Sequence, residues 1–234
     1  MKKASALFAL AFCTHLPGFA CPLCNQQIRN AIYESRFYPN LLIMLSAFIV
    51  LAIIVIIMAI VTTKRHRTYL AAHPAVQVLS PVPLTTASIV VGIGLGGFVD
   101  GIFFHQILQA HEMLSNKIPA TTYIGKSVNM FWDGIFHAFC LIVVIVGVAL
   151  LWKLLWRKDV DRSGKLFCGG LLFGWGLFNV VEGLIDHQIL HLHNVVEYVA
   201  NHNPANYAFL GISVIMLFIG WILISNKNKK RYPA

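Results

Sequence analysis

The stretch that decides the fold is FVDGIFFHQILQAH at positions 98–111, which nearly recurs as VVEGLIDHQILHLH at positions 180–193. Each copy carries an acid followed directly by glycine, then a His-Gln-Ile-Leu run, and finally a histidine. Both copies lie near the end of long apolar runs that predict membrane spans. Ionisable side chains are costly inside a membrane and are usually functional there, so the repeat predicts a site.

The composition around these copies is that of a polytopic membrane protein. The chain has 234 residues, of which 58% are hydrophobic and only 12% are charged, against roughly 25% charged residues in an ordinary soluble domain. The formal charge of +9 comes from basic residues that gather in short clusters beside the apolar runs. This pattern follows the positive-inside rule, so we expect a lipid bilayer as the surroundings and no nucleic acid as a partner.

The first residues have the layout of a secretory signal peptide. Two lysines, an apolar stretch and Ala20 precede Cys21, which predicts a signal peptide over 1–20. Lipidation of Cys21 is the alternative to simple cleavage. The domains expected after it are an outer CxxC segment with the first span (21–67), a cytoplasmic linker (68–83), a four-helix transmembrane domain (84–226) and a basic cytoplasmic tail (227–234).

Five further segments reach the length of about twenty residues that a membrane span needs. They cover 41–61, 84–109, 127–151, 166–190 and 207–224. The expected fold class is therefore all-α, a polytopic membrane helix bundle of about five spans after the signal peptide. Basic residues follow the first, third and fifth spans, which places the C-terminus in the cytoplasm and the N-terminus of the mature chain in the periplasm.

Polar residues of the three middle spans converge toward the periplasmic face in this topology. At about 1.5 Å of rise per residue, Asp100, His137 and Glu182 lie roughly 16 Å below the surface. A second layer, at roughly 9 to 11 Å, holds Asp133, Asp186, His105 and His187.

Two geometric expectations follow if these segments are regular α-helices. The histidine five residues after each acid lies about 140° around the helix from that acid. The two ends of each copy also lie about 16 Å apart, so they cannot all bind one ion. The acids are then expected to form a site only together with Asp133 and His137 from the intervening span.

The charge of this constellation predicts a bound cation. Four carboxylates lie in spans that contain no lysine or arginine, and unpaired anions there would repel one another. A divalent transition metal (zinc, iron or manganese; copper less so) suits mixed imidazole and carboxylate ligands. The expected ligands are Asp100, Asp133, His137, Glu182, Asp186, His105 and His187, with His111, His191 and His193 as secondary candidates. Shared protons, polar contacts between helices and a proton path are the alternatives.

A second motif, Cys21-Pro22-Leu23-Cys24, precedes the first span. Its form is that of a redox dithiol or a soft-metal pair. In an oxidising compartment a small disulfide is the plainer interpretation.

Three motifs together resemble a known family. The run from Gly96 to His111, the Asp133-Gly134 to His137 element and the Glu182-Gly183 to His193 element are similar to bacterial membrane proteins of domain-of-unknown-function family 2243. The resemblance covers about 84–224 and implies a four-span domain in a bacterial inner membrane, without an assigned activity. The chain has Glu112 where that pattern has a second histidine. The first span with Cys21 and Cys24 is expected to be an added module.

The leading functional hypothesis is a periplasm-facing metal site that serves metal handling or the maturation of a respiratory metalloenzyme, with a membrane protein as partner. The first alternative is an intramembrane metal-dependent hydrolase acting on a lipid-like substrate. A structural or proton-conducting membrane subunit is the second alternative, and it needs no metal.

Overall fold

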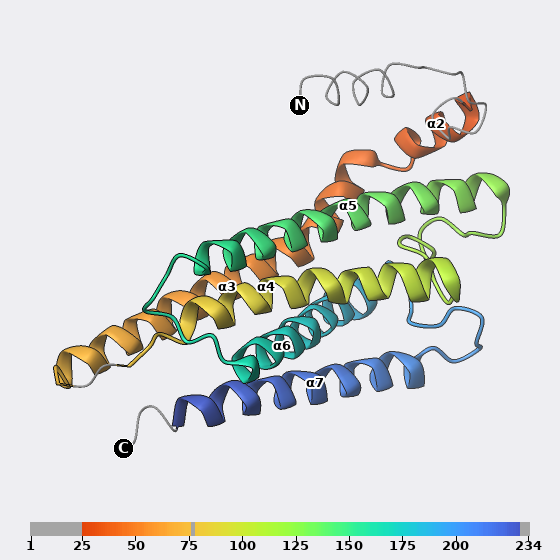
Figure 1. The fold of residues 1–234 in the computed structure, drawn as a ribbon. Helices are drawn as coiled ribbons and strands as arrows, with labels where there is room; N and C mark the ends of the chain where they lie inside the picture. The colour runs from red at the N-terminus through yellow and green to blue at the C-terminus, as the bar shows by residue number, and fades with distance from the viewer. Residues whose placement is uncertain (1–24, 76–77, 230–234) are drawn as a thin grey trace, which may run out of the picture.

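The computed structural model describes residues 25–75 and 78–229, and these form a helical bundle (Figure 1). Two π-helical turns, η2 and η3, directly continue α4 and α6. In chain order the helices are α2 (Gln26–Glu34), α3 (Phe37–Ala72), α4 (Val82–Val99), η2 (Asp100–Ile107), α5 (Tyr123–Leu154), α6 (Gly164–Glu182), η3 (Gly183–Ile189) and α7 (Asn203–Lys229).

Five helices of the described chain are long and apolar enough to cross a membrane. They are Phe37–Ala72, Val82–Ile107, Tyr123–Leu154, Gly164–Ile189 and Asn203–Ser225. These helices confirm the expected all-α bundle of five spans, and the helix ends of the second to fifth lie within about one helical turn of the expected bounds. The expected signal peptide and the Cys21–Cys24 motif fall outside the described residues.

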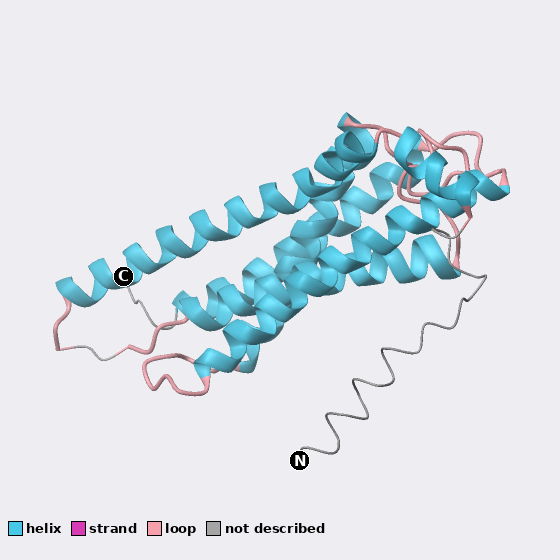
Figure 2. Cartoon of the chain, turned by 90° about the horizontal axis from the view of Figure 1, so that it is seen from above, coloured by secondary structure: helices cyan, strands magenta, loops and turns pink. Residues whose placement is uncertain are grey.

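The central pair of the bundle is α4 and α6, with α5 beside α4 and α7 beside α6 (Figure 1). Loops gather at its two ends (Figure 2). One end, which we call the basic end, carries Lys64, Arg65 and Arg67; the other, the histidine end, carries the loops that follow η2 and η3. Helix α3 closes one side, where Phe48 packs 5.9 Å from Phe136 between ring centroids.

The contact between α4 and α6 is made by glycines at equivalent positions of the two repeats. A Cβ atom on Gly92 would lie 2.3 Å from the carbonyl oxygen of Leu171, and one on Gly174 would lie 2.1 Å from that of Ile89. Ile89 stands in the first repeat where Leu171 stands in the second, so the contact is reciprocal. Reciprocal contacts are those of a two-fold interface. The helices run in the same direction, so the pseudo-two-fold axis lies along them.

The outer helices obey the same relation. A Cβ atom on Gly147 of α5 would lie 2.6 Å from the Val91 side chain, and one on Gly220 of α7 would lie 2.5 Å from the Phe173 backbone nitrogen. Val91 and Phe173 occupy equivalent places in α4 and α6. The repeated unit is therefore a helix pair, α4 with α5 and α6 with α7, and this packing supports the internal duplication that the sequence repeat suggests.

Candidate metal centre

The π-helical turns place each acid of the repeat beside its histidine. In a π-helix the N–H bonds to the carbonyl five residues earlier, so residues five apart become neighbours. Nε2 of His105 lies 3.0 Å from Oδ2 of Asp100, and Nε2 of His187 lies 2.7 Å from Oε1 of Glu182. The expected offset of about 140° was wrong because it assumed α-helical rotation.

The chain reverses direction directly after each π-helical turn. Gln109 and His191, at equivalent positions, both have positive φ values, 49° and 46°. The reversal is closed by hydrogen bonds from the Ala110 N–H to the Phe104 carbonyl and from the Leu192 N–H to the Asp186 carbonyl, both 2.8 Å. These bonds span one residue more than those of the common helix-ending motif with a left-handed residue.

This reversal returns the last histidine of each copy to the interior. Nε2 of His193 lies 3.1 Å from Oε1 of Glu182, and Nε2 of His111 lies 3.9 Å from Oδ1 of Asp100. The expectation that the ends of each copy lie about 16 Å apart was therefore wrong, since it extended one straight helix through the whole motif.

His111 and His193 are each held by the other repeat. Nδ1 of His111 donates to the carbonyl of Val195 at 2.9 Å, and Nδ1 of His193 donates to the carbonyl of Met113 at 3.0 Å. A carbonyl only accepts, so Nδ1 carries the hydrogen in both rings and a neutral ring has its lone pair on Nε2. Burial, with the imidazoles of His105 and His193 nearby, holds the pKa of His111 well below its usual value.

Asp133 of α5 supports the cluster from outside. Its Oδ1 accepts hydrogen bonds from Nδ1 of His105 at 2.8 Å and from the Met113 N–H at 3.1 Å. The second repeat places Asn206 at the equivalent position, where its Oδ1 accepts from the Val195 N–H at 2.9 Å. Asn206 therefore has the same backbone role in the second repeat as Asp133 has in the first, without the charge.

Phenylalanines of the outer helices support the histidines of the π-helical turns. The ring of His105 stacks on Phe136 of α5 with 5.9 Å between centroids, and His187 lies 5.6 Å from Phe209 of α7. The two phenylalanines occupy equivalent places in the repeats. Each imidazole is therefore covered on one face by a phenylalanine from the same outer helix that carries Asp133 in the first repeat or Asn206 in the second.

Two sets of three side chains bring potential ligand atoms within 4.8 Å of one another: His105, His111 and His193, and Glu182, His187 and His193. All five of these side chains are buried. Several of their atoms lack a hydrogen-bond partner, namely Nε2 of His105 and His111, both ring nitrogens of His187, and Oε2 of Glu182. The contacts of His105 with Asp100 and of His187 with Glu182 are therefore close charge contacts without hydrogen-bond alignment, whereas Nε2 of His193 hydrogen-bonds to Oε1 of Glu182 at 3.1 Å.

Three other candidates from the sequence do not belong to these two sets of side chains. Asp186 is buried on η3 and its Oδ1 has no hydrogen-bond partner. His137 lies beside Gly101 and stacks on Phe98 with 6.0 Å between centroids, so it packs behind η2. His191 is exposed at the reversal.

An ion pair lies at the outer edge of the cluster. The ammonium group of Lys126 contacts the carboxylate of Glu112 and donates to the side-chain oxygen of Gln109 at 3.2 Å. Burial raises the pKa of Glu112, and the Lys126 contact opposes that shift. The charge of Lys126 is therefore paired with that of Glu112, the residue next to His111.

Sequence reasoning missed the two carbonyls of Met113 and Val195 and the amide of Asn206. The carbonyls have no side-chain signal. A usable signal for the π-helical turns was present, however, in the acid and histidine that recur five residues apart in both copies.

The family model of a predicted membrane protein, DUF2243, matches residues 87–227 of the chain. No curated protein and no solved structure gives a match.

Proposed function

The chain belongs to the DUF2243 family of predicted membrane proteins, and we propose that its buried histidine cluster binds one divalent transition metal ion. The observation that carries this proposal is the way in which three imidazoles are tied. His105, His111 and His193 each engage Nδ1 with a carboxylate or a carbonyl, and each offers a ring nitrogen within 4.8 Å of those of the other two. Metal-binding histidines characteristically use their second ring nitrogen in this manner, which fixes the tautomer and the ring orientation.

The two sets of potential ligands describe alternative positions for one ion. Both contain His193, and its Nδ1 already donates to Met113. A single Nε2 lone pair binds one metal at a time. We therefore assign His105, His111 and His193 as primary ligands with Asp100 nearby, and Glu182 and His187 as the set toward which the ion can move.

The balance of charge also supports a cation. The side chains of Asp100, Asp133, Glu182 and Asp186 are all buried, and Lys126, on the same helix as Asp133, is paired with Glu112 instead. Buried carboxylates need a compensating positive charge. Imidazole with carboxylate suits zinc, iron or manganese better than copper(I).

The proposed place of the site is the periplasmic face of a bacterial inner membrane. The basic end, which the positive-inside rule assigns to the cytoplasm, lies opposite the histidine cluster. With Cys21 and Cys24 on the periplasmic side, the site would serve metal handling or the maturation of a respiratory metalloenzyme, with a membrane protein as partner.

The alternative is a metal-dependent hydrolase in the membrane. The observation that favours it is Asp186, whose buried Oδ1 lacks a partner beside the cluster. A carboxylate in that place can take a proton from a metal-bound water, whose pKa the cation lowers.

Elemental analysis of purified protein tests the proposal, with His193→Ala against His191→Ala. His193 belongs to both ligand sets, whereas His191 is exposed two residues away in the same loop. We expect one metal ion per chain in the wild type and in His191→Ala, and loss of it in His193→Ala. No stoichiometric metal in the wild type, or equal metal in both variants, would reject the proposal in favour of a structural or proton-conducting subunit. Lipid hydrolysis that is lost in a metal-loaded Asp186→Asn variant would favour the enzyme.

A further inference from the structure

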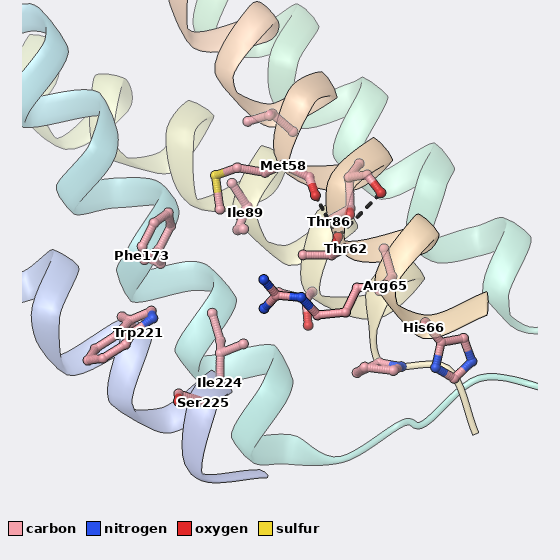
Figure 3. Close-up of a pocket in the computed structure, with 15 residues that line it drawn as sticks. Met58, Thr62, Arg65, His66, Thr86, Ile89, Phe173, Trp221, Ile224 and Ser225 are labelled. Carbon is pink, nitrogen blue, oxygen red and sulfur yellow. Dashed lines mark hydrogen bonds between the residues drawn. The ribbon is translucent and has the colours of Figure 1, made fainter. Parts of the chain in front are cut away.

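A cavity of about 470 Å³ opens at the basic end of the bundle, between α3, α4, α6 and α7. Figure 3 shows that its walls come from all four helices, with Met58, Ile89, Phe173 and Ile224 around it. It contains no residue of the histidine cluster. A cavity between membrane-spanning helices and lined mainly by apolar side chains is suited to hold a hydrocarbon chain.

The polar lining of this cavity includes one arginine and no acid. The side chain of Arg65 reaches from α3 toward α7, on the side of Trp221 and Ile224 (Figure 3). Among the described residues no ion pair or hydrogen bond engages its guanidinium group. The hydroxyl of Thr85, also in the lining, is buried without a hydrogen-bond partner. Thr62 differs, since its hydroxyl donates to the Met58 carbonyl at 2.6 Å.

These features define the chemistry of an occupant. The arginine needs an anion with several acceptor oxygens, and a phosphate group fits its planar fork of donors. Basic pockets between membrane helices are known to take the headgroups of anionic lipids. The apolar walls need an acyl chain, which a free phosphate lacks.

We propose that this cavity binds an anionic glycerophospholipid. Its phosphate contacts the Arg65 guanidinium group, the Thr85 hydroxyl donates to an oxygen of the headgroup or its ester, and one acyl chain lies against Met58, Ile89 and Phe173. Trp221 also lines the site, and tryptophan side chains favour the interface between a membrane and water. The lipid site lies at the opposite end of the bundle from the metal centre and does not depend on it.

Native mass spectrometry of the full chain in detergent, titrated with phosphatidylglycerol or phosphatidylcholine, tests the assignment. The variants are Arg65→Ala and, as a matched control, Arg67→Ala, which removes the same charge from the same helix but lies outside this cavity. We expect Arg65→Ala to lower phosphatidylglycerol retention roughly tenfold through the lost charge-assisted contacts. Arg67→Ala should retain the lipid, and phosphatidylcholine should bind weakly throughout.

Ala59→Phe tests the cavity without a change of charge. Ala59 lies in the wall, so a phenyl ring there should displace the acyl chain and lower retention of phosphatidylglycerol. Thermal unfolding curves identify any variant that fails to fold, and Thr85→Val then replaces it as a conservative test of the buried hydroxyl. Equal losses in Arg65→Ala and Arg67→Ala, equal binding of the two lipids, or displacement by millimolar inorganic phosphate alone would overturn the proposal.

Discussion

The imidazole rings of His111 and His193 lie face to face, with 4.6 Å between centroids and 4° between planes. Each ring is tied through Nδ1 to a carbonyl of the loop that carries the other. Each loop therefore orients the histidine of the other loop, so a change in the conformation of one loop alters the histidine position in both repeats.

Asp133→Asn should weaken metal binding while the fold is retained. The amide oxygen can still accept from the Met113 N–H, but the carboxylate that orients His105 is lost. Loss of such a supporting group typically costs about 10- to 100-fold in metal affinity. Competition with a chromogenic chelator measures the effect, and Asp159→Asn at the exposed basic end is the control. Unchanged affinity would show that Asp133 does not act through His105.

Gly174→Val should destabilise the bundle, because its Cβ atom would meet the Ile89 carbonyl oxygen at 2.1 Å. Overpacking of this kind costs about 1–3 kcal/mol of unfolding free energy. Gly92→Val, the equivalent change, should have a similar effect. Gly134→Ala is the control, since nothing lies within 4 Å of its added carbon. Denaturation in mixed micelles gives the comparison, and a tolerant Gly174 would argue against the close approach of α4 and α6.

Gly101→Ala should conflict with His137. The added Cβ atom would lie 2.4 Å from Nε2 of that ring, so the ring must move or η2 must shift. The additional change His137→Ala should recover part of the lost stability, which a double-mutant cycle measures as a coupling energy. Additive effects of the two changes would mean that the residues do not touch.

Gln109→Gly should stabilise the protein, because Gln109 holds a left-handed conformation at φ 49°. A left-handed conformation costs a residue other than glycine about 1 kcal/mol of stability. The greater conformational entropy of glycine in the unfolded chain offsets part of that gain. Leu108→Gly, in a right-handed conformation one residue earlier, should destabilise instead. Thermal unfolding distinguishes the two, and a loss of stability in both would contradict the reversal at Gln109.

The spans were predictable because an apolar run of about twenty residues is typical of a membrane-spanning helix. All five predicted runs fall on helices. The identities of Asp100, His105, Glu182 and His187 as buried polar groups followed from the same runs. Their mutual geometry did not follow, since helical arithmetic assumes a constant rotation per residue and η2 and η3 depart from it. The return of His111 and His193 depends on backbone reversals whose residues are not glycine, so the usual sequence signal for such a turn is missing.

The swapped carbonyl contacts have a consequence for the origin of the protein. A two-helix ancestor that paired with a second copy of itself would already enclose four histidines around its axis, two from each copy. Fusion of the two copies allows equivalent positions to differ in sequence, as Asp133 differs from Asn206 and Asp100 from Glu182. The fused chain can then build a centre with one carboxylate-supported histidine, an arrangement that identical subunits cannot produce.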